Sequence, residues 1–146
     1  MHRRIAIGTT AIALALVAAL VYAGLRSSPE PPPRSLSGKV TITDTKGFSW
    51  DPGTCTGGGR FADIVEGAPI VIRDPDGRTL AAGKLGSGMP EKPTRDASSQ
   101  TAAHCTFLVP AAAVPSRPAY RVQIGRQPPS EVAGPDIERL TLRFGS

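Results

Sequence analysis

The chain has 146 residues, a formal net charge of +5, two cysteines and no asparagine. Residues 1–37 hold 4 Lys or Arg against 1 acidic residue, a net of +3, whereas residues 38–146 hold 13 against 11, a net of +2. The larger part therefore lacks the basic cluster of a nucleic-acid-binding protein, and its few aromatic residues could not stack bases, which excludes that class of partner.

The first predicted element is a membrane-spanning helix. Residues 5–25 carry no charged side chain and follow Arg3 and Arg4. A helix of this length spans roughly 31 Å, close to the hydrocarbon thickness of about 30 Å. Because Arg-rich flanks stay in the cytoplasm, we expect residues 1–4 inside and the rest outside the plasma membrane. The alternative is a signal peptide cut before Gly24, which would leave a secreted protein.

Small side chains recur along this predicted helix. Ala11, Ala15, Ala19 and Ala23 follow a four-residue spacing and would lie on one side of the helix. Small residues allow another helix to approach closely, so this face is a candidate surface for a membrane partner or a weak homo-oligomer. Alanine is so common here that the spacing could also arise by chance.

Residues 26–38 are rich in proline and serine and follow the predicted helix. A proline run favours an extended polyproline conformation, so this segment is expected to be a stalk that holds the domain away from the membrane. The remaining residues, 39–146, are enough for one small domain.

That domain is predicted to be all-β, because its apolar residues alternate in short runs bounded by Gly, Pro and Asp. Asp74-Pro75-Asp76-Gly77 is typical of a hairpin turn. We expect a helical turn near residues 61–66 and a long loop over 85–100. The whole pattern predicts a small antiparallel β-sandwich of about six to eight strands, with the recognisable strands at 39–43, 69–73, 78–85, 101–109, 119–125 and 137–144.

Cys55 and Cys105 both follow the predicted membrane segment. Two cysteines in a small exported domain usually form a disulfide, which we therefore predict. The alternative is a thiol site in which His104 serves Cys105 as a base. Neighbouring residues of a strand point to opposite faces, which argues against this pairing.

No other pattern predicts a catalytic, cofactor or metal site. Asp74 and Asp76 offer carboxylates to a cation, but the hairpin turn explains both residues without metal. Phe48 and Trp50 are a candidate ligand-facing aromatic pair. The alternative is that they belong to the core, as the single Trp of a small sandwich often does.

Two stretches carry a family pattern: the run from Gly67-Ala68-Pro69-Ile70-Val71-Ile72 through Asp76-Gly77, and Tyr120-Arg121-Val122. In these stretches the chain resembles the transthyretin-like β-sandwiches, which include carboxypeptidase-regulatory-like and collagen-adhesin B-type domains. A second set of residues consists of Cys55, Gly58, Gly59, Asp63, Ile64, Gly67 and Ala68. It is similar to a run in small exported proteins of high-GC Gram-positive bacteria, a group with no assigned function. The resemblance covers roughly residues 64–125 and implies a fold rather than an activity.

These observations predict a membrane-anchored extracytoplasmic domain that is not an enzyme and acts as a binding or scaffolding module of the cell envelope. Its expected partners are the membrane and an envelope protein or wall polymer. One alternative is an accessory subunit of a membrane complex that contacts its partners through the helix. The other is a small envelope hydrolase or thiol-redox protein that uses His104, Asp63 or the cysteines.

Overall fold

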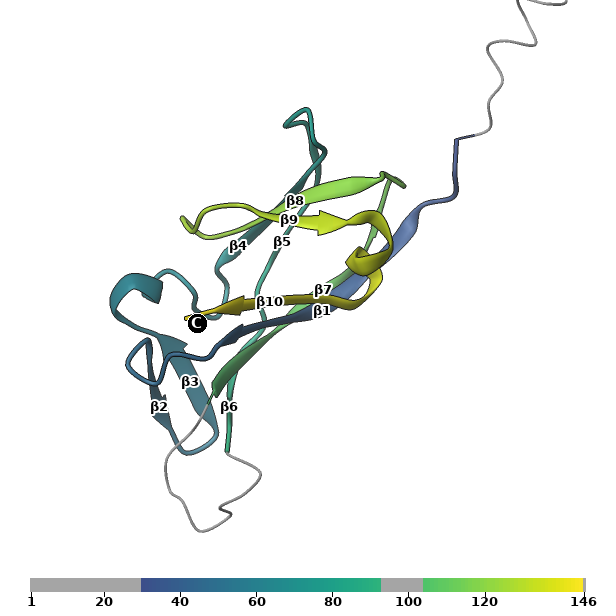
Figure 1. The fold of residues 1–146 in the computed structure, drawn as a ribbon. Coiled ribbons are helices and arrows are strands. Elements are labelled where there is room, and N and C mark those ends of the chain that lie inside the picture. The colour runs from purple at the N-terminus through teal and green to yellow at the C-terminus, as the bar shows by residue number, and fades with distance from the viewer. Residues whose placement is uncertain (1–29, 93–103, 146) are drawn as a thin grey trace, which may run out of the picture. The chain divides into compact units, whose positions relative to one another are not determined.

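The computed structural model describes residues 30–92 and 104–145 (Figure 1). The predicted membrane helix over residues 5–25, with its alanine face, lies outside the described residues, as do residues 1–4 and the first part of the predicted stalk. Within the described ranges, no helix has the length and apolar character needed to cross a bilayer.

Strands dominate the described part of the chain, which confirms the prediction of an all-β domain. Two short 3-10 helices interrupt them. In chain order the elements are β1 (Arg34–Ile42), β2 (Phe48–Asp51), β3 (Thr54–Gly57), η1 (Gly59–Phe61), β4 (Pro69–Arg73), β5 (Thr79–Lys84), β6 (Gly88–Glu91), β7 (His104–Val114), β8 (Ala119–Ile124), β9 (Ser130–Ala133), η2 (Gly134–Arg139) and β10 (Leu140–Phe144).

The strands form two four-stranded sheets and one small hairpin. One sheet has the order β10-β1-β7-β6, the other has the order β5-β4-β8-β9, and β2 pairs with β3. Figure 1 shows β8 and β9 running above β10 and β1. The pairings are antiparallel except that β1 and β10 run parallel. The first sheet is therefore mixed, which differs from the antiparallel arrangement expected from the sequence.

One apolar cluster joins the two sheets. Val40 and Ile42 on β1 pair with Phe107 and Cys105 on β7, and all four side chains are 0% exposed. Residues directly opposite each other in paired strands share a face, so these side chains point into the core together. From the second sheet, Ile72 lies in the same cluster. Full burial of a Val, Ile or Phe side chain stabilises the fold by about 1.5–3 kcal/mol.

Several element boundaries differ from the predicted ones. Strand β1 begins at Arg34, inside the range expected to be stalk, and β6 lies within the predicted loop over 85–100. Pro90 is tolerated in β6 because this strand is the edge of its sheet. The predicted strand over 137–144 begins instead as η2, with Pro135 in its first turn and Ile137 fully buried.

The predicted turn between β4 and β5 is confirmed. Gly77 has φ +87°, a left-handed conformation that favours glycine. The Asp74 carboxylate, 2% exposed as a residue, accepts a hydrogen bond of 2.8 Å from the Arg78 N–H. The Asp74 and Arg78 side chains also form an ion pair at 3.4 Å. The buried carboxylate thus holds the turn closed.

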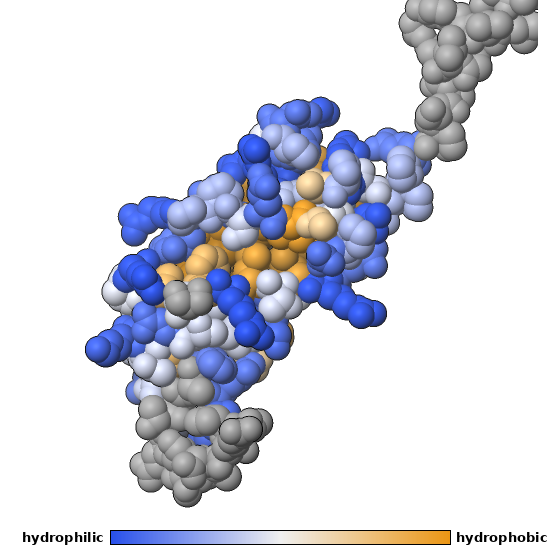
Figure 2. Space-filling model, in the orientation of Figure 1, coloured by the Kyte–Doolittle hydropathy of each residue, from blue (hydrophilic) through white to orange (hydrophobic). Residues whose placement is uncertain are grey.

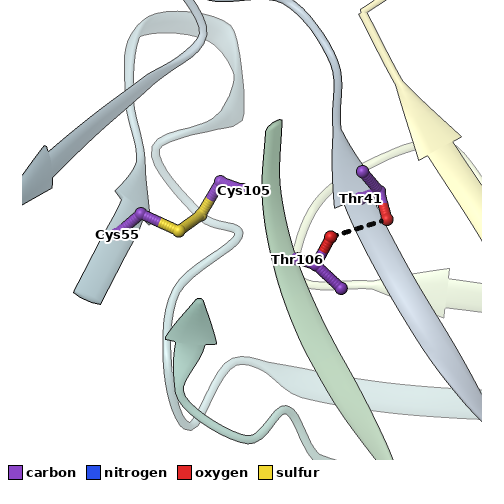
Figure 3. Close-up of a disulfide and its surroundings, with 4 residues drawn as sticks. All are labelled: Thr41, Cys55, Cys105 and Thr106. Atoms are coloured by element: carbon purple, nitrogen blue, oxygen red, sulfur yellow. Dashed lines mark hydrogen bonds between the residues drawn. A yellow bond between two sulfur atoms is a disulfide. The ribbon is translucent and has the colours of Figure 1, made fainter. Parts of the chain in front are cut away.

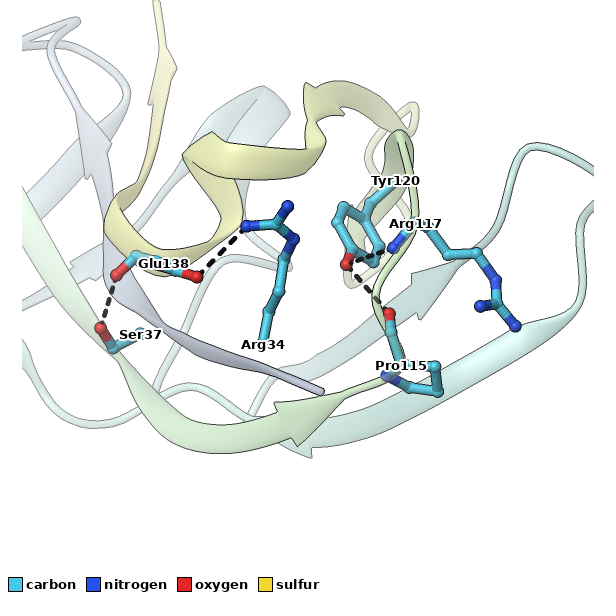
Figure 4. A network of polar contacts seen from close by, with 6 residues as sticks. All are labelled: Arg34, Ser37, Pro115, Arg117, Tyr120 and Glu138. Atoms are coloured by element: carbon cyan, nitrogen blue, oxygen red, sulfur yellow. Dashed lines mark hydrogen bonds and ion pairs between the residues drawn. The ribbon is translucent and has the colours of Figure 1, made fainter. Parts of the chain in front are cut away.

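Figure 4 shows two sets of polar contacts, one between β8 and the β7–β8 loop and the other between β1 and η2. The fully buried Tyr120 donates its hydroxyl proton to the Pro115 carbonyl at 2.9 Å and accepts the Arg117 N–H at 3.0 Å. In β-sandwiches with Greek-key connections, a buried Tyr often forms a hydrogen bond from its hydroxyl to the backbone a few residues upstream. Nearby in the same view, Arg34 pairs with Glu138 of η2 at 3.3 Å.

Candidate functional site

The structure confirms the predicted disulfide between Cys55 and Cys105 (Figure 3). The Cα atoms are 5.9 Å apart, and the two residues are 5% and 0% exposed. The bond joins β3 to β7 and so fastens the β2–β3 hairpin to the larger sheet. Neither sulfur is a free thiol.

The opposite face of β7 carries a different set of side chains. Figure 3 shows Thr41 and Thr106 pointing away from the disulfide, and their hydroxyl oxygens lie 3.1 Å apart. His104 is the neighbour of Cys105 on β7 and pairs across the sheet with Glu91. His104 is therefore not placed to act as a base toward Cys105.

The candidate aromatic pair on β2 packs inward. Phe48 is 7% exposed and belongs to the core, and Trp50 is half-buried and packs against the same cluster. Trp50 pairs directly with Cys55 on β3. Part of the Trp50 side chain therefore remains accessible to a ligand. Phe48 has almost no accessible surface.

Asp63 takes part in a polar cluster that fixes the β8–β9 connection. Its carboxylate accepts hydrogen bonds from the Arg126 N–H and from the Gln127 side chain. Partial burial raises the pKa of Asp63, but these hydrogen bonds outweigh burial and hold the pKa below its ordinary value of 3.8. These contacts are structural, because they join the turn after η1 to the loop between β8 and β9.

The described residues contain no group of three His, Cys, Asp or Glu side chains placed to hold a metal ion. Asp74 is committed to its own turn by Arg78, as described above, and Asp76 is exposed.

The feature with the clearest capacity for binding is an apolar cavity of about 130 Å³ between β5 and β7. Both sheets contribute to it. Strands β1 and β4 form its floor, and residues 81–83 of β5 and 109–112 of β7 form its sides. Its lining consists of Leu36, Ile70, Ile72, Ala81, Ala82, Gly83, Val109, Pro110, Ala111 and Ala112. We call this cavity, with the strand segments Thr79–Lys84 and Val109–Val114 beside it, the β5–β7 seam.

Small side chains keep the β5–β7 seam open. Gly83 pairs with the buried Ile70, so a side chain at position 83 would point to the core face. A Cβ atom built there meets no heavy atom within 4 Å. Across the seam, Ala112 pairs with the buried Leu36 yet remains exposed. At these core-facing positions the chain thus carries residues too small to close the gap.

The two sides of the β5–β7 seam also carry strand edges that lack a neighbour in the described part of the chain. Strand β5 ends its sheet and pairs only with β4. Strand β6 pairs with β7 only over His104–Phe107, and a last backbone bond joins Gly86 to Leu108. Beyond Leu108, β7 has no strand on the side away from β1 within the described residues.

Apolar residues also gather at the other edge of the two sheets. Figure 2 shows a band of apolar residues between β8 and β9 above and β10 and β1 below, with polar residues around it. At this edge Val132 of β9 and Leu142 of β10 are only 8% and 7% exposed.

Sequence reasoning missed this site. The signals that could have indicated it are the run Ala81-Ala82-Gly83, within the predicted strand over 78–85, and the run Pro110-Ala111-Ala112-Ala113, directly after the predicted strand over 101–109. Their meaning depends on the two runs facing each other, which only the fold establishes.

No family model matches this chain, and no curated protein or solved structure matches it significantly.

Proposed function

We propose that the protein is a binding module of the cell envelope, held at the membrane by residues 5–25 and built as a transthyretin-like β-sandwich outside it. The observation that carries the proposal is the β5–β7 seam, with its apolar cavity that reaches the core between the two sheets. A concave apolar site with few polar groups is the usual form of a ligand-binding surface.

The disulfide supports a place outside the cytoplasm. Buried disulfides persist in oxidising compartments and are rare in the cytosol. Residues 1–25 supply the export signal and the anchor in this proposal. The intact protein should stay in the membrane fraction after washing with alkaline carbonate. Recovery of most of it as a soluble species that starts near Gly24 would replace the anchor with a cleaved signal peptide.

Binding through the seam can be tested in intact bacterial cells with a photo-crosslinking amino acid. Ala82 on β5 and Ala133 on β9 are both exposed, small and on edge strands of the same sheet. We expect a crosslinked adduct from position 82 and none from position 133. Adducts of equal yield at both positions, or at neither, would contradict a binding function for the seam.

A further inference from the structure

We propose that the cavity of the β5–β7 seam binds the end of a linear acyl chain, whose carboxylate or ester head group stays at the mouth near Lys84. This inference rests on the proposed binding function and names the class of ligand. Three observations favour it: the width of the opening, the size and lining of the cavity, and the polar groups at its mouth.

The opening is too narrow for a polypeptide strand. Cα atoms of β5 and β7 approach within 8 Å of each other. A strand placed between two others needs about 4.7–4.9 Å on each side, or about 10 Å in all. At the core-facing positions beside the opening the chain has Ala81, Gly83 and Ala112. The gap between such small residues admits a single hydrocarbon chain but not a backbone with its side chains.

The cavity itself is suited to hydrocarbon. None of its lining residues has a polar side-chain atom, and Ile70 and Ile72 at its floor are 2% and 1% exposed. A charged group placed there would lose its hydration without gaining a side-chain partner. The volume of about 130 Å³ is close to the roughly 150 Å³ of an apolar cavity that takes up benzene, a molecule of six carbon atoms. The cavity therefore holds about the last six carbons of a chain.

The mouth of the cavity favours an acyl head group. In the described part of the chain, β5 has no strand on the side that faces the seam, so its N–H groups there can donate to carboxylate or ester oxygens. Lys84 follows Gly83 at the end of β5 and is exposed. It is the only charged residue of Thr79–Lys84 and Val109–Val114. Because opposite charges attract, an anionic head group is favoured over a cationic one.

The first test uses the intact protein in nanodiscs and n-alkyl carboxylates from butanoate to decanoate, at free concentrations corrected for uptake by empty discs. Binding is read from the NMR shifts of the Ile70 and Ile72 methyl groups, which line the cavity. The methyl groups of Ile137, which is buried outside this lining, are the internal control. Each methylene that enters the cavity should raise the affinity about fourfold. The affinity should level off beyond about six carbons, where the tail fills the space.

The second test changes the seam. Gly83→Val places methyl groups in the open space at position 83 and should weaken hexanoate binding by about tenfold or more, because it takes the room of about two methylenes. Ala112→Val fills the cavity from the β7 side and should have the same effect, which keeps the test available if Gly83→Val does not fold. Ala133→Val on the edge strand β9 is the matched control and should bind as the wild type does. Lys84→Gln should weaken the binding of hexanoate but not of hexanol.

Two arms distinguish the sources of the acyl chain. One places a phospholipid with isotope-labelled chain ends in the disc bilayer, and the other adds a free fatty acid with the same label. A nuclear Overhauser effect between the labelled chain end and the Ile70 methyl groups in the first arm assigns a membrane lipid. The same signal in the second arm alone assigns a free fatty acid.

Other outcomes overturn the proposal. An affinity that keeps rising through decanoate, or that Gly83→Val and Ala112→Val leave unchanged, would show that the carboxylates do not fill the cavity. The absence of a signal in both labelled arms would remove acyl chains as the ligand. If a protein rather than a lipid is crosslinked at Ala82 in cells, the acyl ligand is wrong but the binding function stands. If no crosslink forms and no carboxylate binds, both proposals fail.

Discussion

Removal of the Cys55–Cys105 disulfide should cost a large share of the stability of this domain. The bond links residues 50 apart in sequence. Constraining a loop of that length in the unfolded chain is worth about 4 kcal/mol in the chain-entropy model. Domains of this size are stable by only about 5–15 kcal/mol in total. We therefore expect Cys55→Ala with Cys105→Ala to lower the free energy of unfolding by about 3–5 kcal/mol.

The assay is urea unfolding of the intact protein, followed by tryptophan fluorescence because Trp50 pairs with Cys55 and reports on the hairpin. Reduced wild type is the control that separates two contributions. It loses the crosslink but keeps both buried sulfur atoms, so its difference from the double variant measures packing alone. The loss should also be greatest near β2 and β3, since the bond fastens this hairpin to β7. A double variant within about 1 kcal/mol of the oxidised wild type would refute the loop-entropy reasoning.

Three further predictions concern polar groups that are buried or partly buried. Tyr120→Phe should lower the free energy of unfolding by about 1–3 kcal/mol in chemical denaturation, because two backbone groups lose the hydroxyl that joins them; an unchanged value would make that hydroxyl dispensable. Asp74→Ala should cost a similar amount by the same measurement, whereas the exposed Asp76→Ala in the same turn should be close to neutral, and equal losses would contradict the role of burial. The lowered pKa of Asp63 means that its ionised form stabilises the fold above about pH 4 and that this contribution is lost as the pH falls through the folded-state pKa. The stability advantage of wild type over Asp63→Asn should thus shrink below pH 4, and an advantage that stays constant with pH would show that the charge of Asp63 contributes nothing.

The parts of the fold that were predictable have strong local signals. The turn at Asp74–Gly77 combines a proline at its second position with a glycine that adopts φ +87°. The strands on either side of it, β4 and β5, were expected close to their observed limits. The disulfide followed from the number of cysteines alone, without any knowledge of which strands it joins.

The parts that were missed depend on contacts between distant residues. Strands β2, β3, β6 and β9 each have four residues, too few for a reliable alternating pattern. In β6, Pro90 argues against a strand, and only the edge position next to β7 makes it acceptable. At Ile137 a strand was predicted where the structure has a 3-10 helix. The side chain is buried because η2 packs against the core.

The β5–β7 seam is a case in which local sequence and stability disagree. Valine at the core-facing positions 83 or 112 would favour the strand conformation more than glycine or alanine does. The chain instead has Gly83 and Ala112 there, and the core behind them stays open. Residues that lower stability without a local reason are characteristic of functional sites. The exposed Lys84 lies at the end of the same edge strand, where a charge limits unwanted pairing with other chains. The small residues at positions 83 and 112 thus account for the opening beside β5 and β7, and Gly83→Val tests whether that opening lowers the stability of the fold.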